Sequence, residues 1–411
     1  MRLSKDLFLK LIFSAVLLLV GSTQIYAQEL ETDSLEDDKS SQGLIRYGSK
    51  GFEFNTKDNR FLLQIQSRLQ FRFATPEDQD PVTFDDFTDE KNAQFKINRA
   101  RLKIGGHAFQ PWIKYDWEFE LAQTNLLNFR IKIEKWEWLS FQVGQWKIEY
   151  SQERVISSGE QQMVDRSVIN RPFTIDRQQG VGVYGHLKGN GAADFNYWAA
   201  ALTGTGRGTT SNDDNHLMYL GRLQWNFLGR GLEFEGSDLE IHEKPSALIA
   251  VSGVTNRSPY TRFSQAGGGS LEGYEEGEPG QYRVNQANIE TALMYNGFSL
   301  QSEVHWKEIT DKLNNNNADL LRGYYVQAGY FFHQSFDWWP KPLELAARNA
   351  AYDPNVEADE TKKRETSVVL NWFFNGHKNK LSFETSYFVY NTESLERTDE
   401  WRFRVQWDIS F

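Results

Sequence analysis

The sequence predicts a transmembrane antiparallel β-barrel of about sixteen strands around a water-filled lumen, and two segments carry this prediction. In residues 61–73, apolar side chains occupy every second position except Ser67, and polar side chains fill the positions between them except Leu62. The same alternation runs from Trp401 to Phe411. Because successive side chains of a strand point to opposite faces, each segment offers one face to lipid and one to water.

The first 27 residues have the pattern of a secretory signal peptide. Basic Arg2, Lys5 and Lys10 precede an apolar stretch over residues 11–20, and the small Ala27 marks a cleavage site. The apolar stretch is too short to span a bilayer as a helix. Residues 28–50 are polar and acidic, which predicts a flexible periplasmic segment. Residues 51–411 are then the expected barrel domain.

The composition agrees with a barrel whose hydrophobic residues are spread by alternation. The chain is 39% hydrophobic and has a mean hydropathy of −0.61, and no later segment has the 18 consecutive apolar residues of a membrane helix. Aromatic residues make up 14%, which suits strands and interfacial girdles. An aromatic-rich secreted adhesin or sugar-binding sandwich is the alternative. The net charge of −11 gives no indication of nucleic-acid binding, and the lack of cysteine excludes disulfides and thiol-ligated metals.

Sixteen candidate strands follow the acidic segment. They lie near residues 61–73, 95–109, 112–122, 127–135, 138–147, 180–188, 193–203, 217–226, 246–255, 282–295, 298–309, 322–332, 343–352, 364–374, 381–391 and 400–411. Connections 74–94, 148–179, 204–216 and 256–281 are long, whereas 110–111, 189–192, 296–297 and 375–380 are short. This alternation is typical of long outer loops and short periplasmic turns. Connections 227–245 and 333–342 are longer than expected of periplasmic turns, and 123–126 is short for an outer loop.

A barrel of this strand number encloses an aqueous channel, and nothing before residue 61 is long enough to be a folded plug. Basic side chains gather on the expected lumen faces of the early strands. Arg99, Arg101 and Lys103 share one face, and a switch of the apolar phase between Ile97 and Ala100 predicts a bulge near Asn98. Further lumen cations are Arg68, Arg72, Lys114, Arg130 and Lys132. These cations either attract anions to the pore or pair with Asp116, Glu118, Glu120 and Glu134 in a neutralised wall.

Several motifs together resemble the phosphate- and polyphosphate-selective porins (the porin O/P family). They are Asn98-Arg99-Ala100-Arg101-Leu102-Lys103-Ile104-Gly105-Gly106, Phe141-Gln142-Val143-Gly144-Gln145-Trp146-Lys147, Asp165-Arg166-Ser167, Gly180-Val181-Gly182-Val183 and Glu344-Leu345-Ala346-Ala347-Arg348. The resemblance runs from about residue 51 to residue 411. It implies a homotrimer in the bacterial outer membrane, an inward-folded third long loop at 148–179, and anion transport along basic side chains. By resemblance, Lys147, Arg166 and Arg348 join Arg99, Arg101 and Lys103 as candidates for the anion path.

Two departures bear on selectivity. The family often has a second arginine where this chain has Asn98. The outer connection 74–94 is also strongly acidic, and 256–281 carries four glutamates close together. A negative vestibule repels anions over a Debye length, so a weakly selective general porin without phosphate preference is the alternative function.

An enzyme is not expected. The seven histidines are scattered, and neither Gly-x-Ser-x-Gly nor His-Glu-x-x-His occurs, which disfavours a barrel-embedded hydrolase. No cofactor or metal site is expected. The expected partners are outer-membrane lipid and small anionic solutes, and the expected function is passive diffusion of small hydrophilic solutes, with phosphate or polyphosphate as candidate anions.

Overall fold

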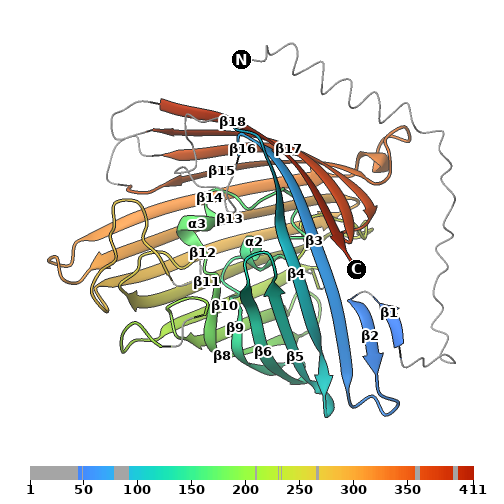
Figure 1. Cartoon of the computed structure of the whole chain (residues 1–411), viewed down its shortest axis with the longest axis horizontal. Coiled ribbons are helices and arrows are strands. Elements are labelled where there is room, and N and C mark those ends of the chain that lie inside the picture. The colour runs from blue at the N-terminus through green and yellow to red at the C-terminus, as the bar shows by residue number, and fades with distance from the viewer. Residues whose placement is uncertain are drawn as a thin grey trace. The chain divides into compact units, whose positions relative to one another are not determined.

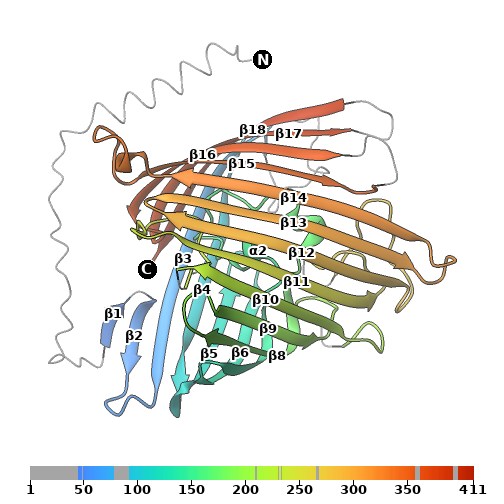
Figure 2. The same ribbon diagram turned by 180° about the vertical axis from the view of Figure 1, so that it is seen from behind.

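The computed structural model describes residues 45–48, 50–77, 92–208, 211–229, 231–232, 234–264, 268–356, 362–391 and 397–411. Within them, β3 to β18 form a closed ring of sixteen antiparallel strands in which each strand pairs with the next and β18 pairs with β3 (Figures 1 and 2). The predicted fold class and strand number are therefore confirmed.

The sixteen ring strands are β3 (Leu62–Thr75), β4 (Gln94–Ala108), β5 (Gln110–Glu120), β6 (Asn125–Trp136), β7 (Leu139–Lys147), β8 (Arg177–Lys188), β9 (Asp194–Leu202), β10 (Met218–Leu228), β11 (Ser246–Ser258), β12 (Tyr282–Tyr295), β13 (Phe298–Asp311), β14 (Ala318–Tyr330), β15 (Leu343–Asp353), β16 (Lys363–Asn375), β17 (Asn379–Asn391) and β18 (Arg397–Ser410). The described helices are short: α2 (Gln152–Val155), α3 (Asn170–Phe173) and the 3-10 turn η2 (Phe332–Gln334). No helix in the described ranges is long and apolar enough to cross a membrane.

Two strands outside the ring, β1 (Ile45–Gly48) and β2 (Gly51–Asn55), form a hairpin beside β3. One edge of β3 is shared: its residues 62–65 pair with β2, and its residues 68–75 pair with β18. Ser67, between these stretches, exchanges two backbone hydrogen bonds of 2.7 and 2.9 Å with Phe411. The expected flexible segment 28–50 therefore ends in a paired strand, because β3 is longer than β18 can cover. Residues 28–44 and the expected signal peptide lie outside the described residues.

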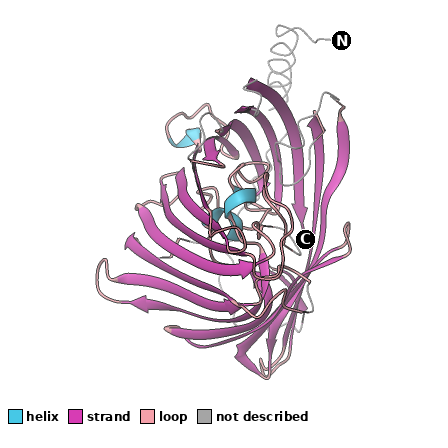
Figure 3. Cartoon of the chain, turned by 90° about the vertical axis from the view of Figure 1, so that its left-hand side faces the viewer, coloured by secondary structure: helices cyan, strands magenta, loops and turns pink. Residues whose placement is uncertain are grey.

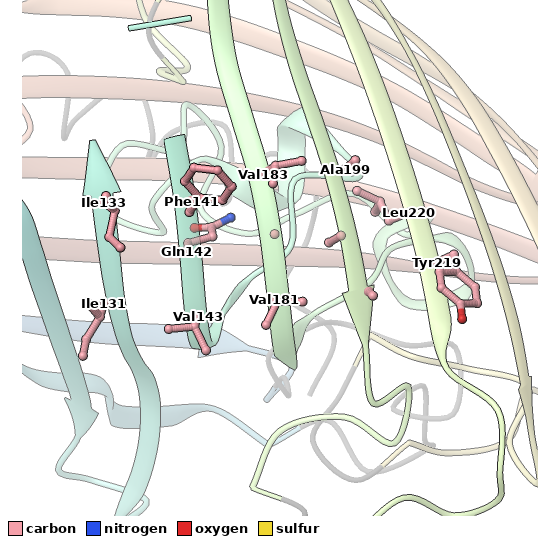
Figure 4. Close-up of a pocket in the computed structure, with 13 residues that line it drawn as sticks. Ile131, Ile133, Phe141, Gln142, Val143, Val181, Val183, Ala199, Tyr219 and Leu220 are labelled. Carbon is pink, nitrogen blue, oxygen red and sulfur yellow. The ribbon is translucent and has the colours of Figure 1, made fainter. Parts of the chain in front are cut away.

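Burial along the strands is inverted relative to a water-soluble protein. Phe95 is 84% exposed on the outer face of β4, whereas Arg404 of β18 is 1% exposed on the lumen face. The outer face of β6 to β10 carries an apolar groove of about 570 Å³, lined by side chains such as Ile131, Phe141 and Val181 (Figure 4). This distribution matches a barrel that has lipid outside and polar contacts inside.

The register between β3 and β4 confirms the predicted bulge. Gln70 pairs with Arg99 and Phe71 pairs with Ile97, so the register skips Asn98. The extra residue restores the outward direction of Ala100 after Ile97 and turns Arg99 into the lumen. The bulge therefore determines which of the basic residues of β4 face the pore.

Gly144 in β7 is required where the strand leads into the long connection to β8. Its φ is +128°, and an added Cβ would lie 2.1 Å from the Phe129 carbonyl oxygen of β6. We expect Gly144→Ala to destabilise the barrel by roughly 1–3 kcal/mol, because both the backbone and the neighbouring strand must shift. Gly221→Ala in β10 is the matched control, since an added Cβ there meets nothing within 4 Å. The temperature at which heat-modifiable gel mobility is lost should fall for the first variant alone; equal temperatures would contradict the argument.

Candidate functional site

The connection between β7 and β8, residues 148–176, folds into the lumen and is named the inner loop. It carries α2 and α3, which lie inside the ring of strands (Figure 3). Its chain turns at Ser151, whose hydroxyl accepts a hydrogen bond from the Arg154 N–H and so caps α2. Nearly all of its residues are buried. This places an inward-folded loop where the resemblance implied one.

Carboxylates of the barrel wall hold the backbone of the inner loop. The N–H groups of Glu153, Val164 and Val168 donate to the side chains of three wall glutamates at 2.7, 2.7 and 2.9 Å, and these are Glu303 of β13, Glu384 of β17 and Glu365 of β16. A buried carboxylate satisfied by backbone N–H groups is a strong, directional contact. Three carboxylates of the wall therefore hold the inner loop through its backbone.

Two further connections enter the lumen. The β11–β12 connection places Phe263 in an apolar cluster with Trp146, Tyr150 and Phe173 of the β7–β8 region, and its Phe263 carbonyl accepts from the Asp176 N–H at 2.9 Å. The β10–β11 connection, predicted to be unusually long, enters from the periplasmic end: the Gly236 N–H donates to the Glu160 carbonyl at 3.1 Å. Ser237 also donates to Glu344 of β15 at 2.9 Å. The first segment packs on the inner loop, and the second contacts both the inner loop and β15.

A cavity of about 310 Å³ lies between the inner loop and the wall formed by β4 to β8. We call it the basic cavity, because its lining contains seven cations and two carboxylates. The cations are Arg99, Arg101, Lys147, Arg154, Arg166, Arg177 and Arg207, and the carboxylates are Glu120 and Asp176. Four of the residues predicted from the sequence, Arg99, Arg101, Lys147 and Arg166, meet here.

The carboxylates are tied to arginines at the edge of the cavity. Asp176 lies 2.5 Å from Arg154 and 3.3 Å from Arg177. Burial opposes ionisation of Asp176, but these two guanidinium groups outweigh it and hold the pKa of Asp176 well below its ordinary value. Arg101 pairs with Glu118 at 3.0 Å and with Glu120 at 2.8 Å. Even with Glu118 counted beside the two lining carboxylates, the cations of the cavity are in excess.

Two cations of the inner-loop region bind carbonyl oxygens instead of carboxylates. Lys147 donates to the carbonyls of Val155 and Ile156, each at 3.2 Å, and Arg166 donates to the carbonyl of Ile156 at 2.9 Å. Burial, reinforced by Arg154, lowers the pKa of Arg166 to about 9, so this side chain remains charged at neutral pH. Carbonyl oxygens fix these groups in position and add no carboxylate to the cavity.

Below the basic cavity, the lumen face of β5 and β6 is a salt-bridged wall. Arg130 pairs with Asp116 at 2.5 Å, and Glu134 accepts from Lys114 at 2.6 Å and lies 3.4 Å from Lys132. The neutralised-wall alternative therefore applies to Lys114, Arg130 and Lys132. Lys103 of β4 differs, because it makes no ion pair with any residue in the described part of the chain.

The structure places Arg68, Arg72 and Arg348 beneath the inner loop rather than along the basic cavity. Arg68 pairs with Asp408 at 2.5 Å and donates to Ser158 at 2.7 Å. Arg72 lies 3.5 Å from Asp165 and donates to the Val164 carbonyl. Arg348 pairs with Glu365 and donates to the Asp165 carbonyl at 2.8 Å. These three side chains position the loop that borders the cavity.

Sequence reasoning missed three cations of the cavity: Arg154, Arg177 and Arg207. Arg154 and Arg177 lie in the connection 148–179 that the resemblance predicted to fold inward, so its basic residues were detectable as a group. Arg207 lies beyond the end of β9 and follows no alternation that marks it. Within the described ranges, no group of three or more His, Asp or Glu side chains is arranged to hold a metal ion.

Comparison with solved structures finds the same barrel at low sequence identity. OmpT of Vibrio cholerae, folded in vitro, is 10% identical, with 87% of this chain and 99% of that chain covered and a TM-score of 0.55. OmpF of Salmonella typhi, in complex with daunomycin, is 12% identical, with 87% and 100% covered and a TM-score of 0.51. An anion-selective porin from Comamonas acidovorans is 9% identical, with 85% and 99% covered and a TM-score of 0.50.

Comparison with curated protein sequences found no match. The sequence profile described as phosphate-selective porin O and P, in contrast, matches residues 69–401, which include every strand from β4 to β17. That match covers most of the chain and agrees with the closed sixteen-stranded ring and its polar lumen. The protein therefore belongs to the phosphate-selective porin O and P family and is an outer-membrane porin.

Proposed function

We propose that this porin passes small anions, with phosphate and polyphosphate as its characteristic solutes, and that the basic cavity is the selective part of the path. The observation that carries the proposal is the excess of seven cations over two carboxylates in the lining of one cavity beside the inner loop. Rings and clusters of Arg and Lys attract anions into pores. The family description and the anion selectivity stated for the Comamonas acidovorans porin support the same conclusion.

The path runs from Arg207, Arg154 and Arg177 at the outer side, past Arg99 and Arg101, to Lys103. The salt-bridged wall with Lys114, Arg130 and Lys132 follows on the periplasmic side. Arg68, Arg72 and Arg348 act indirectly, by holding the inner loop. The chain works as a passive channel and not as an enzyme.

Reversal potential in a planar bilayer tests the proposal. Purified protein under a salt gradient should give the sign of an anion-selective pore, and phosphate added to one side should reduce chloride current. An unselective or cation-selective current would indicate a general porin governed by its acidic outer connections. Most of the acidic outer connection, residues 78–91, lies outside the described residues.

Export and assembly complete the proposal. We infer that residues 1–27 are removed as a signal peptide and that the mature chain forms a homotrimer, as the family resemblance implies. N-terminal sequencing of the outer-membrane form should begin at Gln28. The mass of the unheated detergent complex should correspond to three chains.

Asp176 provides a prediction about pH. The pKa of Asp176 is lower in the folded protein than the ordinary carboxyl pKa of about 4. Its ion pair therefore contributes its full stability above that ordinary pKa, and this stability is lost as the pH falls through the lower folded-state pKa. Asp176 is therefore ionised at both pH 7 and pH 5. We expect Asp176→Asn to raise the anion-to-cation permeability ratio severalfold, because one of two lining carboxylates loses its charge. The permeability ratio of the variant divided by that of the wild type should be the same at both pH values. A quotient near one at pH 5 would show that Asp176 is already protonated there.

A further inference from the structure

The outward face of the barrel carries a second feature where β15 ends and β16 begins on the extracellular side, next to the middle of β13 and β14. A groove of about 790 Å³ lies there. The strand register places its side chains next to one another. Trp306 of β13 pairs with Arg322 of β14. One row across the four strands consists of Val304, Tyr324, Ala351 and Arg364, each paired with the next. Paired residues share a face of the sheet. Val304 and Tyr324 are among the exposed apolar residues, so this face is the one turned to lipid.

The groove combines three cations with an apolar base. Arg322, Lys362 and Arg364 line it and make no ion pair with any residue in the described part of the chain, although Asp353 lies opposite Arg322 in the register. Ala351 contributes only a methyl group between Tyr324 and Arg364, which leaves the space open. Glu357, Asp359 and Glu360 of the following connection lie outside the described residues.

The position of the groove determines the kind of ligand that fits. It opens toward the membrane, and we place it at the level where the outer leaflet meets water, because β15 ends and β16 begins beside it on the extracellular side. Trp and Tyr favour that level, and cations there contact anionic headgroups. A free anion gains no favourable contact with the apolar surface of Val304 and Tyr324 beneath the cations, whereas an acyl chain covers that surface.

We propose that this groove binds a phosphorylated lipid of the outer leaflet. Arg322, Lys362 and Arg364 contact the headgroup phosphate, with bidentate contacts from the arginines, and one acyl chain lies over Ala351 beside Val304 and Tyr324. The site is separate from the basic cavity, because its residues face the opposite side of the sheet. It gives the barrel a fixed annular lipid on the outer leaflet.

Native mass spectrometry of the detergent-purified porin tests the proposal with bis-phosphorylated lipid A as the probe. Wild type should retain at least one lipid A per chain. The triple variant Arg322→Gln, Lys362→Gln and Arg364→Gln should lose affinity at least tenfold. Lys135→Gln is the control, since Lys135 is an exposed outward cation at the periplasmic end of β6, stacked on Trp112 and Trp136. It should bind lipid A as the wild type does.

A second variant keeps the charges and fills the groove. Ala351→Phe points toward lipid, so it should fold, and it should also reduce lipid A retention. Equal retention by the wild type and by both groove variants would overturn the proposal. Displacement of the lipid by millimolar inorganic phosphate would overturn it in favour of a free-anion site. A change of oligomeric state with unchanged lipid binding would instead identify the groove as a contact between copies of the chain.

Discussion

Replacing Arg99, Arg101 and Lys103 with Gln should bring the reversal potential under a salt gradient close to zero while the channel still conducts. The first two side chains line the basic cavity, and Lys103 follows on the same face of β4. A unit charge about 7 Å from a permeating anion contributes roughly 0.6–2.4 kcal/mol at effective dielectric constants between about 80 and 20. Three lost charges therefore change the anion-to-cation permeability ratio by at least about tenfold.

The effect exceeds the simple loss of charge because of Glu118 and Glu120. Both carboxylates pair with Arg101 in the native protein. Without Arg101, Glu120 loses its ion pair and faces the cavity, and Glu118 keeps its contact with Arg177 at 3.1 Å. The local potential then becomes less favourable to anions than the count of removed cations alone implies.

Two further variants isolate the cause. Arg207→Gln removes a lining cation that has no ion pair among the described residues, so it should lower the ratio severalfold without disturbing a network. Replacing Lys50, Lys57 and Lys135 with Gln removes three exposed cations away from the lumen and should leave the ratio unchanged. If the control triple shifts the ratio as much as the cavity triple, selectivity follows the overall charge of the protein rather than the basic cavity.

The strands were predictable because lipid and water impose opposite demands on alternate residues. That constraint is local, so it revealed β3, β18 and even the bulge at Asn98. The hairpin of β1 and β2 was not predicted, because four- and five-residue strands at the end of an acidic segment carry too few alternations. Its role depends on the edge of β3 that β18 leaves unpaired, which only the closed ring reveals.

The candidate site was predictable as a set of cations and not as an arrangement. Alternation placed Arg68 and Arg101 on lumen faces, but their partners decide their roles. Arg68 pairs with Asp408, 340 positions later in the chain, and no spacing rule reports such a contact. Arg101 remains beside the basic cavity because its partners come from β5. Tertiary packing therefore decides whether a lumen cation lines the basic cavity or holds the inner loop.

Arg348→Met should release the inner loop and make the channel wider and noisier. The Arg348 guanidinium pairs with Glu365, lies 3.7 Å from Glu153, and donates to the Asp165 carbonyl, so it joins β15 and β16 to two points of the inner loop. Removing one partner of a buried ion pair leaves an uncompensated charge and costs about 3–5 kcal/mol. Glu365 also accepts from the Val168 N–H, so the carboxylate that loses its guanidinium partner contacts the loop at a third point.

Arg222→Met is the matched control for this loss. Arg222 is equally buried and pairs with Glu290 at 2.7 Å, but both residues belong to the barrel wall, in β10 and β12. Both variants should lower the temperature at which heat-modifiable mobility is lost, so that measurement alone does not separate them. Trypsin does: cleavage at Arg154 or Arg166 requires the inner loop to leave the wall. We expect cleavage and higher single-channel conductance in Arg348→Met, and protection with native conductance in Arg222→Met. Protection in both variants would mean that the wall glutamates hold the loop without Arg348, through contacts such as those of Glu303 and Glu384.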